Sequence, residues 1–537
     1  MIQTRTRGEH FTHPSSKIQS MSDVAGAKTR IRLQNFLDRA GLRGFPWKTA
    51  MILYPISWGW LFIAGKIDVL NEPLYWRKTE TFRNQGFAPW VDFIYTDFFD
   101  FVFPYFGGFV FLAHFIVGLC FFTIISSLKF LERSQVKFFI FLVLLAPFNT
   151  ARVSSMTVVY TCSLLTFVFA WALLIKAESK VVKLLSLILF FISFATHSLI
   201  FFYVFPLLHV FLLDQPKSFN AVIIRLKRNL LIFLPPLLYV SLRAAFWTDV
   251  PNYHDVNSEK LLNGFKFLIP IVAIGFIVFF YGQNLRFRNL PGVRTILIGL
   301  FASGFGSLAY LIMGFYQADF SFFRTFAITF VGRSAWLSRH QLLQALGFAL
   351  ILVGFVQLVS VLSIRLAKFL SVAVIAFCVF FSVCFGFEYV VDSQKQDRII
   401  DALNESLEKR SDLAELRNYV FVDQASLLNA RGRPYKSSTY SIWLHQARYR
   451  GDRKNLLTNF APWNVSGDCN TTKDGTFVLI RGPETHWEAL KNWVGDGDMG
   501  FEVTVDDTPG ACKPEMVTSE KVSGAIPILF YFTGARG

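Results

Sequence analysis

The stretch FFIFLVLLAPFNTARVSSMTVVYTCSLLTFVFAWALLI, residues 138–175, decides the fold. It holds two apolar runs, near 138–148 and 155–175, separated by a short polar turn that contains Arg152. Apolar runs of this kind are typical of membrane helices, which need about 20 residues to cross the hydrocarbon layer. Because the first run is shorter than this, we expect the helix ends at the turn to face water or protein rather than lipid. The stretch therefore predicts a membrane hairpin with a recess at its outer turn.

Apolar segments of the same kind continue through most of the chain. The 537 residues are 53% hydrophobic and their mean hydropathy is +0.43, which excludes a soluble domain of ordinary composition. The segments lie near 49–65, 101–127, 138–148, 155–175, 184–196, 199–213, 229–247, 267–282, 295–314, 341–364 and 369–389. The sequence thus predicts an all-α polytopic membrane protein with about eleven transmembrane helices.

The charges of the connecting loops give the orientation of these segments. Every second loop carries lysine and arginine with few acids, as cytoplasmic loops do. Residues 1–48, with nine Lys or Arg against three acids, are predicted to be a cytoplasmic tail. The transmembrane region is then predicted to span residues 49–390. Its loops 66–100 and 315–340 are predicted to lie on the outer side of the membrane. This bias, together with anionic lipids, explains the net charge of +16 better than nucleic acid does, because the basic residues are scattered over short loops.

Residues 391–537 differ in character from the apolar part of the chain. Ile399, Leu403 and Leu407 fall on one face of a predicted helix. Strand-like runs follow it, with Gly, Asp, Asn and Pro in the turns between them. These runs are NYVFV (418–422), TFVLI (476–480), FEVTV (501–505) and IPILFYF (526–532). We therefore predict a small α/β domain on the outer side of the membrane.

The first outer loop carries the candidate catalytic acids. Asp97 and Asp100, in FIYTDFFDFVFPY, lie about one helical turn apart near the membrane surface, and Asp92 is close by in the sequence. Burial among phenylalanines raises the pKa of a carboxylate and suits it to general-base work. Asp68 and Glu72, just after the first apolar segment, are further candidates. The structural alternative is that Asp100 caps a helix and Asp97 is solvated.

Basic residues in the outer loops break the charge pattern and are candidate ligands for phosphate. An arginine such as Arg152 in this turn is costly unless it meets an anion or open water. The other candidates are Arg324, Arg333, Arg339, His340 and, in FATHSLIFF, His197. Arginine forks match phosphate oxygens in pairs. The alternatives are that Arg152 anchors at lipid headgroups, that the loop arginines attract outer-leaflet phosphates, and that His197 is structural.

Several other kinds of site have no signature in the sequence. There is no Walker A loop and no GxGxxG that opens a helix after a strand, so the sequence argues against use of ATP or a dinucleotide. No group of residues has the spacing of a metal site. Cys469 and Cys512 lie in the polar C-terminal region and are predicted disulfide partners if that region is outside the cytoplasm. His209, deeper toward the inner side, is expected to be structural.

This layout resembles the C-type superfamily of integral-membrane glycosyltransferases, which take sugars from polyprenyl-phosphate carriers at the outer face of the membrane. The resemblance covers essentially the whole chain: a cytoplasmic N-terminus, many crossings, a long first outer loop with acids and an outer C-terminal domain. NEPLY, residues 71–75, is similar to the family's Asp-Glu pair followed by Tyr. Asn71 replaces the Asp, which puts the role of Glu72 in doubt and shifts weight to Asp97 and Asp100.

A second resemblance is to bacterial polymerases of O-antigen and exopolysaccharide. It rests on Arg152 in an outer turn, followed one hairpin later by THS at 196–198. A polymerase is therefore an alternative function, although the sizeable outer C-terminal domain argues against it. A lipid or polysaccharide flippase is an alternative of another class, but the sequence shows few charges at mid-membrane and no matched halves.

The first resemblance implies an inverting sugar transfer at the bacterial inner membrane, with a cytoplasmic N-terminus and a periplasmic C-terminal domain. One acid would deprotonate or orient a hydroxyl of a glycan or glycolipid acceptor. The arginines would hold the departing lipid phosphate, whose negative charge grows in the transition state. The partners implied are this lipid-linked sugar donor, the acceptor and membrane lipids. A divalent cation, Mg or Mn, is compatible with the reaction, but the sequence offers no clear site for it.

Overall fold

The computed structural model describes residues 41–64, 90, 93–94, 98–102, 105–128, 131–153, 157–212, 223–224, 227, 229–246, 269, 273, 291–312, 341–409, 418–429, 440, 443–444, 447, 464–466 and 476–506. The chain divides into two compact units, Met1–Pro46 and Trp47–Gly537. All the helices and strands described below belong to the second unit.

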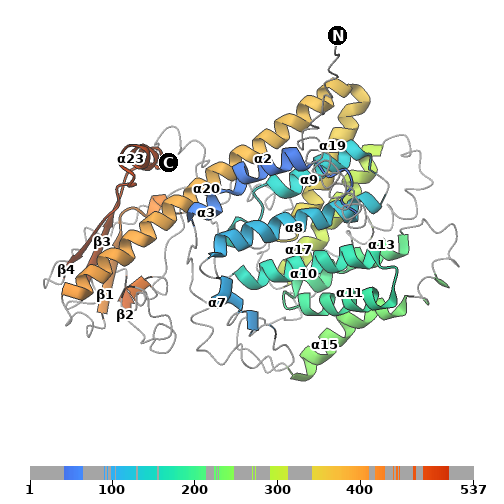
Figure 1. The fold of residues 1–537 in the computed structure, drawn as a ribbon, viewed down its shortest axis with the longest axis horizontal. Coiled ribbons are helices and arrows are strands. Elements are labelled where there is room, and N and C mark those ends of the chain that lie inside the picture. Colours follow the sequence, from blue (N-terminus) through green and yellow to red (C-terminus); the bar gives the residue numbers. More distant parts are fainter. Residues whose placement is uncertain are drawn as a thin grey trace, which may run out of the picture. The chain divides into compact units, whose positions relative to one another are not determined.

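Helices make up most of the described chain, and they follow the apolar segments (Figure 1). In chain order they are α2 (Trp47–Trp58), α3 (Trp60–Ala64), α7 (Phe99–Val102), α8 (Phe106–Ser127), α9 (Arg133–Leu145), η3 (Thr150–Val153), α10 (Val158–Lys176), α11 (Lys180–Ser193), α12 (Ser198–Phe202), α13 (Val204–Leu212), η5 (Leu230–Phe233), α15 (Leu234–Phe246), α17 (Pro291–Ile312), α19 (Gln344–Leu362) and α20 (Ile364–Lys409).

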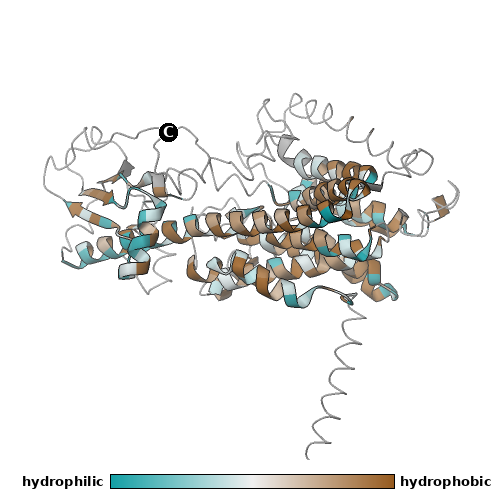
Figure 2. Ribbon diagram, turned by 90° about the horizontal axis from the view of Figure 1, so that it is seen from above, coloured by the Kyte–Doolittle hydropathy of each residue, from teal (hydrophilic) through white to brown (hydrophobic). Residues whose placement is uncertain are grey.

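Four described helices are long and apolar enough to cross a membrane: α8, α10, α19 and α20. Three shorter apolar helices accompany them, at Ser198–Phe211, Leu230–Phe246 and Gly292–Ser307. Figure 2 shows hydrophobic residues dominating the bundled helices. These features indicate a membrane protein. The number of about eleven crossings stays a prediction, because the segment 267–282 lies almost wholly outside the described residues.

Small residues bring α17 and α19 into close contact. A Cβ at Gly299 would press on the backbone of Ile351, and one at Gly347 would press on Ser303. Glycine at these positions lets the two helix backbones approach, as small residues do between membrane helices. The amide of Gln344 donates to the hydroxyl of Ser307 at 2.7 Å across the same contact. This pair forms one wall of the helical region.

The last helix, α20, is 46 residues long, which corresponds to about 69 Å. It joins the last apolar segment to the amphipathic helix predicted after residue 390, so the chain has no break between them. The predicted face is confirmed: Ile399 and Leu403 are buried in a core with the strands, and Leu407 packs against that core. One helix therefore connects the apolar bundle to the sheet.

The sheet has four strands in the order β2-β1-β3-β4. β1 (Asn418–Asp423) pairs in parallel with β2 (Asn464–Ser466) and β3 (Thr476–Arg481), and β3 pairs antiparallel with β4 (Glu502–Asp506). The strands predicted at 418–422, 476–480 and 501–505 are confirmed. The short β2 was not predicted, and the run 526–532 lies outside the described residues.

The short helix η10 (Ser426–Leu428) and the helix α23 (His486–Asp496) follow the strands in the same part of the described chain. α23 is capped by the Thr485 hydroxyl accepting from the backbone N–H of Glu488 at 3.1 Å. Its C-terminal end is closed by Gly497, whose φ of +74° favours glycine. A periplasmic position for this α/β region stays a prediction, because no membrane is present in the structure.

Candidate functional site

The turn between α9 and α10 holds the buried arginine. α9 ends at Leu145, two residues before Pro147, which cannot continue a helix. The chain then turns sharply at Asn149, whose φ of +50° is unusual for a residue other than glycine. The backbone N–H of Arg152 donates to the carbonyl of Asn149 at 3.1 Å and closes the short 3₁₀ helix η3. Arg152 thus lies in η3, and its side chain is buried.

Arg152 is only 3% exposed. Its guanidinium carbon lies 3.7 Å from the ring centroid of Trp58, a cation–π contact. Trp58 is itself fixed, because its indole N–H donates to the carbonyl of Leu144 at 2.8 Å. Trp58 comes from α2, so a residue about ninety positions earlier in the sequence provides the platform on which the guanidinium rests.

The guanidinium is not fully satisfied by the protein. Its Nε and Nη2 atoms are buried and have no hydrogen-bond partner within the described ranges. None of the ion pairs between described residues involves Arg152. A buried charge without a partner costs free energy, and in proteins such a charge is normally paired. An arginine in this state is suited to receive an anionic group from a ligand.

A small cavity of about 30 Å³ lies next to Arg152. This is room for about two water molecules, and so for one small polar group rather than a whole sugar. His114 and Asn149 also line it, and the Nε2 atom of His114 has no hydrogen-bond partner among the residues the structure describes. The rest of the lining is apolar: Val117, Phe121, Val143, Phe148, Leu164, Phe202, Leu342, Leu343, Ala345 and Leu346. Three nitrogen-bearing side chains, those of Arg152, His114 and Asn149, thus meet in an otherwise apolar recess.

Aromatic side chains surround the far side of the guanidinium. Trp58 and Trp60 have ring centroids 5.7 Å apart, and Trp60 stacks on Tyr389 of α20 at 5.4 Å with an interplanar angle of 3°. The hydroxyl of Tyr389 donates to Oγ1 of Thr150, in the same 3₁₀ helix as Arg152, at 3.4 Å. The Arg152 turn is therefore held by α2, α3 and α20 together.

The structure describes three of the predicted site residues in part or in full. Arg152 lines the cavity just described, and the predicted opening of a recess to the outer face stays a prediction. Asp100 belongs to α7, where only its backbone is described. The others lie outside the described residues, and their roles stay predictions: Asp68, Glu72, Asp92, Asp97, Arg324, Arg333, Arg339, His340, Cys469 and Cys512.

His197 lies at the N-terminal end of α12, half-buried, with its ring 6.0 Å from that of Tyr239. The residue of this segment that lines the cavity beside Arg152 is Phe202. The structure therefore places the apolar end of α12, and not His197, at this cavity. A role of His197 in binding phosphate stays a prediction.

Several residues of the site, among them His114 and Trp58, were not singled out in the sequence. His114 is the histidine of the apolar segment 101–127, and a polar residue inside such a segment is a signal of function or of internal pairing. Trp58 carries no comparable signal, because an aromatic residue in an apolar segment is ordinary. Its role depends on a contact between helices that are distant in the sequence.

A second buried histidine, His209, has the structural role expected of it. The indole N–H of Trp171 donates to its Nδ1 at 3.2 Å, so the proton of the neutral ring is on Nε2. Nε2 lies 3.0 Å from Oγ of Ser127, and that hydroxyl donates to the carbonyl of Ile124 at 2.6 Å. A histidine that donates to the serine cannot take its proton, so this network joins helices and does not activate a nucleophile.

Neither a metal site nor a comparison with known proteins assigns a function to the residues around Arg152. Among the described residues, no group of three or more His, Cys, Asp or Glu side chains is arranged to hold a metal ion. No family model, no curated protein and no solved structure matches this chain. The chemistry of the site is therefore argued from the residues around Arg152.

Proposed function

We propose that the protein is a membrane glycosyltransferase, which moves a sugar from a polyprenyl-phosphate carrier to a surface glycan or another acceptor at the outer face of the membrane. The observation that carries this proposal is the buried guanidinium of Arg152, which lines a cavity with two of its nitrogens unsatisfied by the described residues. The resemblance in layout to the C-type glycosyltransferases supports it.

The surroundings of Arg152 favour a phosphate attached to a lipid. The cavity is lined by α8, α9, η3, α10, α12 and the start of α19, and three of these helices, α8, α10 and α19, are long and apolar enough to cross a membrane. A free, strongly hydrated phosphate gains little from apolar walls. A phosphate on an isoprenoid tail arrives with apolar surface of its own, and it supplies the oxygens that the guanidinium fork fits.

In the proposed reaction, the acceptor hydroxyl oxygen bonds to the anomeric carbon of the sugar while the bond from that carbon to the phosphate oxygen breaks. The phosphate leaves with the bonding electron pair, and the hydroxyl proton passes to a carboxylate, for which Asp97 and Asp100 are the candidates. Arg152 stabilises the charge that grows on the phosphate, and it does so in a water-poor site where such contacts are strong. The sugar lies outside the cavity, which is too small to hold it.

The test uses purified protein in lipid nanodiscs with polyprenyl-phosphate and polyprenyl-phosphate sugars. Wild type is compared with Arg152→Gln, Arg152→Lys and Arg294→Gln, the last being an exposed arginine of α17. A hydrogen bond to a charged group contributes about 1.5–3 kcal/mol, so Arg152→Gln should weaken binding of polyprenyl phosphate about ten- to a hundredfold. Arg294→Gln should leave it unchanged. Equal affinity for wild type and Arg152→Gln would remove the basis of the proposal.

A flippase is the second candidate, and one feature favours it. The apolar helix Ser198–Phe211 is irregular at Tyr203, between α12 and α13, although the backbone N–H of Tyr203 still donates to the carbonyl of Leu199 at 2.9 Å. Irregular helices are common in transporters. Arg152-dependent binding of polyprenyl phosphate without sugar transfer to any acceptor, but with movement of the lipid across a vesicle membrane, would assign the site to transport.

A further inference from the structure

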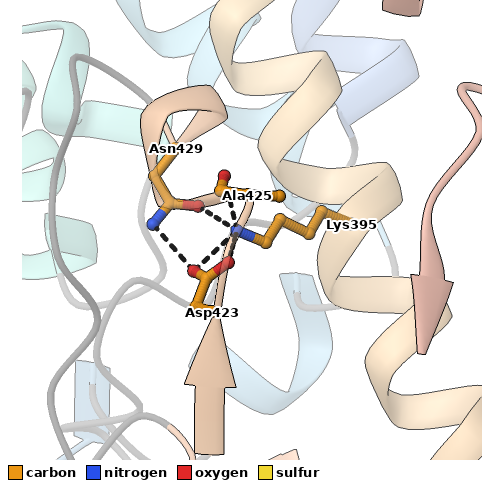
Figure 3. Close-up of polar contacts among 4 residues, drawn as sticks. All are labelled: Lys395, Asp423, Ala425 and Asn429. Carbon is orange, nitrogen blue, oxygen red and sulfur yellow. Dashed lines mark hydrogen bonds and ion pairs between the residues drawn. The ribbon is translucent and has the colours of Figure 1, made fainter. Parts of the chain in front are cut away.

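Lys395 is a buried lysine whose hydrogen bonds are all made. It lies on α20 with its side chain 0% exposed. Its ammonium donates to both carboxylate oxygens of Asp423 at 2.6 Å, to Oδ1 of Asn429 at 2.6 Å and to the carbonyl of Ala425 at 3.0 Å (Figure 3). Asn429 also donates to Asp423 at 3.3 Å. An ammonium has three N–H donors, and these acceptors use all of them.

The acceptors lie at a particular place in the sheet. Asp423 is the last residue of β1, and β1 has the parallel neighbours β2 and β3 on its two sides. Strand order reverses there, and the carboxyl ends of parallel strands at such a reversal are the usual ligand position of open α/β sheets. Here the position is occupied by a side chain of α20. The carboxyl end of β1 and the residues that follow it thus hold α20.

The same stretch of α20 reaches the Arg152 turn. Six residues before Lys395, Tyr389 stacks on Trp60 and donates to Thr150. Between them, the hydroxyl of Ser393 donates to the carbonyl of Ala64, the last residue of α3, at 2.9 Å. Less than two helical turns therefore separate the anchor in the sheet from the contact with η3.

The fit between α20 and the aromatic platform is close. A Cβ at Gly386 would collide with the ring of Trp60, so only glycine lets the helix approach this far. Trp60 in turn packs against Trp58, on which Arg152 rests. A rotation or shift of α20 would move Tyr389 and Trp60, and with them the support of the guanidinium.

We propose that Lys395 is a positioning residue for the Arg152 site: by fixing α20 to the carboxyl end of β1, it holds Tyr389 and Trp60 where they support the arginine. The proposal rests on the proposed function, in that it takes the Arg152 cavity as the binding site for a lipid-linked phosphate. It assigns to the C-terminal sheet the task of setting the affinity of a site inside the helical bundle.

The first experiment is a double-mutant cycle on binding of polyprenyl phosphate in nanodiscs. The background change is the pair Lys395→Met with Asp423→Leu, which removes the anchor without leaving one buried charge unpaired. The pair should weaken binding about tenfold, within the usual range of coupling between sites. In this background Arg152→Gln should cost much less affinity than it costs in wild type, because the arginine is already displaced.

The matched control is Arg398→Met, one turn further along α20. Arg398 pairs with Asp498 at the surface, with side chains 48% and 39% exposed, so its loss should leave binding unchanged. A merely structural role of Lys395 would lower the yield or the melting temperature of the paired variant, but would leave the affinity per folded molecule and its dependence on Arg152 as in wild type. That result would overturn the proposal.

The outcomes for the two proposals are distinct. Absence of Arg152-dependent binding in wild type overturns the proposed function. Arg152-dependent binding in wild type that is unaffected by the paired variant overturns only the role of Lys395. If the paired variant does not fold, Tyr389→Leu is the second test, because it breaks the same connection at its other end. Unchanged affinity in Tyr389→Leu would likewise overturn the proposal.

Discussion

Replacement of Arg152 by methionine should make the ligand-free protein more stable. The guanidinium is buried, and within the described chain its Nε and Nη2 atoms lack partners. Removing a charge from such a place recovers a desolvation cost of several kcal/mol. The loss is the cation–π contact with Trp58, about 0.5–2 kcal/mol, since methionine fills much of the same volume and still packs on the ring. The net expectation is a gain of about 1–3 kcal/mol.

The assay is thermal unfolding of purified protein in detergent, followed by fluorescence, with and without polyprenyl phosphate. Arg152→Met should unfold at a higher temperature than wild type when no lipid phosphate is added. Lipid phosphate at a hundred times its wild-type Kd should stabilise wild type by about 2.7 kcal/mol, and it should stabilise a variant of ten- to a hundredfold weaker affinity by only about 0.4–1.4 kcal/mol. Arg294→Met, at an exposed position on α17, controls for loss of charge and should behave as wild type.

One result would refute this reasoning directly. If Arg152→Met were destabilised by more than about 2 kcal/mol without ligand, the guanidinium would already be satisfied inside the protein. Arg152 would then be a structural residue, and the cavity would not be a site for an anion.

Three further predictions concern local features of the fold. Gly495→Ala in α23 should stabilise the sheet region by about 0.5–1 kcal/mol, because the added Cβ would meet nothing within 4 Å. Gly497→Ala should destabilise the same region, because the φ of +74° at this position favours glycine. Urea unfolding of each variant checks both expectations. Gly347→Leu should greatly reduce the yield of monodisperse protein in size-exclusion chromatography, because the side chain would collide with Ser303 on α17, and a normal profile would contradict the proposed close packing. Burial lowers the pKa of His486 to about 4, so the unfolded state takes up a proton at a higher pH than the folded state does. The free energy of unfolding should therefore fall by about 3 kcal/mol between pH 6.5 and pH 4. Proteolysis of the sheet region across this pH range should show the loss of stability, and His486→Gln should flatten the profile.

Patterns that repeat over many neighbouring residues predicted the elements well. The apolar segments that became α8, α10 and α19 are long and contain no charged residue, and the strand-like runs that became β1, β3 and β4 are bounded by turn residues. β2 escaped prediction because it has three residues, too few for any pattern, and owes its conformation to pairing with β1.

The continuity of α20 shows a different reason for a missed prediction. The sequence predicts a boundary between the last apolar segment and the polar helix after residue 390, because the composition changes there. Composition reports the surroundings of a helix, and not its ends: neither proline nor a capping glycine interrupts the chain between Tyr389 and Ile399. The absence of a stop signal was the better guide.

The candidate site could be predicted only in part. Arg152 was singled out as a candidate because a charged residue in a turn between two apolar runs is unusual. This signal is local in the sequence and does not depend on the tertiary structure. Trp58, His114 and Tyr389 come from three other helices, and their meeting with Arg152 depends on packing between segments distant in the sequence. No local pattern specifies such a contact.

The two buried cations of the described chain show how burial alone fails to identify a function. Lys395 and Arg152 are both almost fully enclosed. Lys395 meets a carboxylate, an amide oxygen and a carbonyl, so its charge is neutralised and its donors are used. Arg152 meets an aromatic face and a cavity, and part of its fork is left without an acceptor by the residues described around it. A protein that satisfies one buried cation so completely has the means to satisfy the other. The difference between the two is the basis of the proposal that Arg152 binds a ligand, whereas Lys395 holds parts of the fold together.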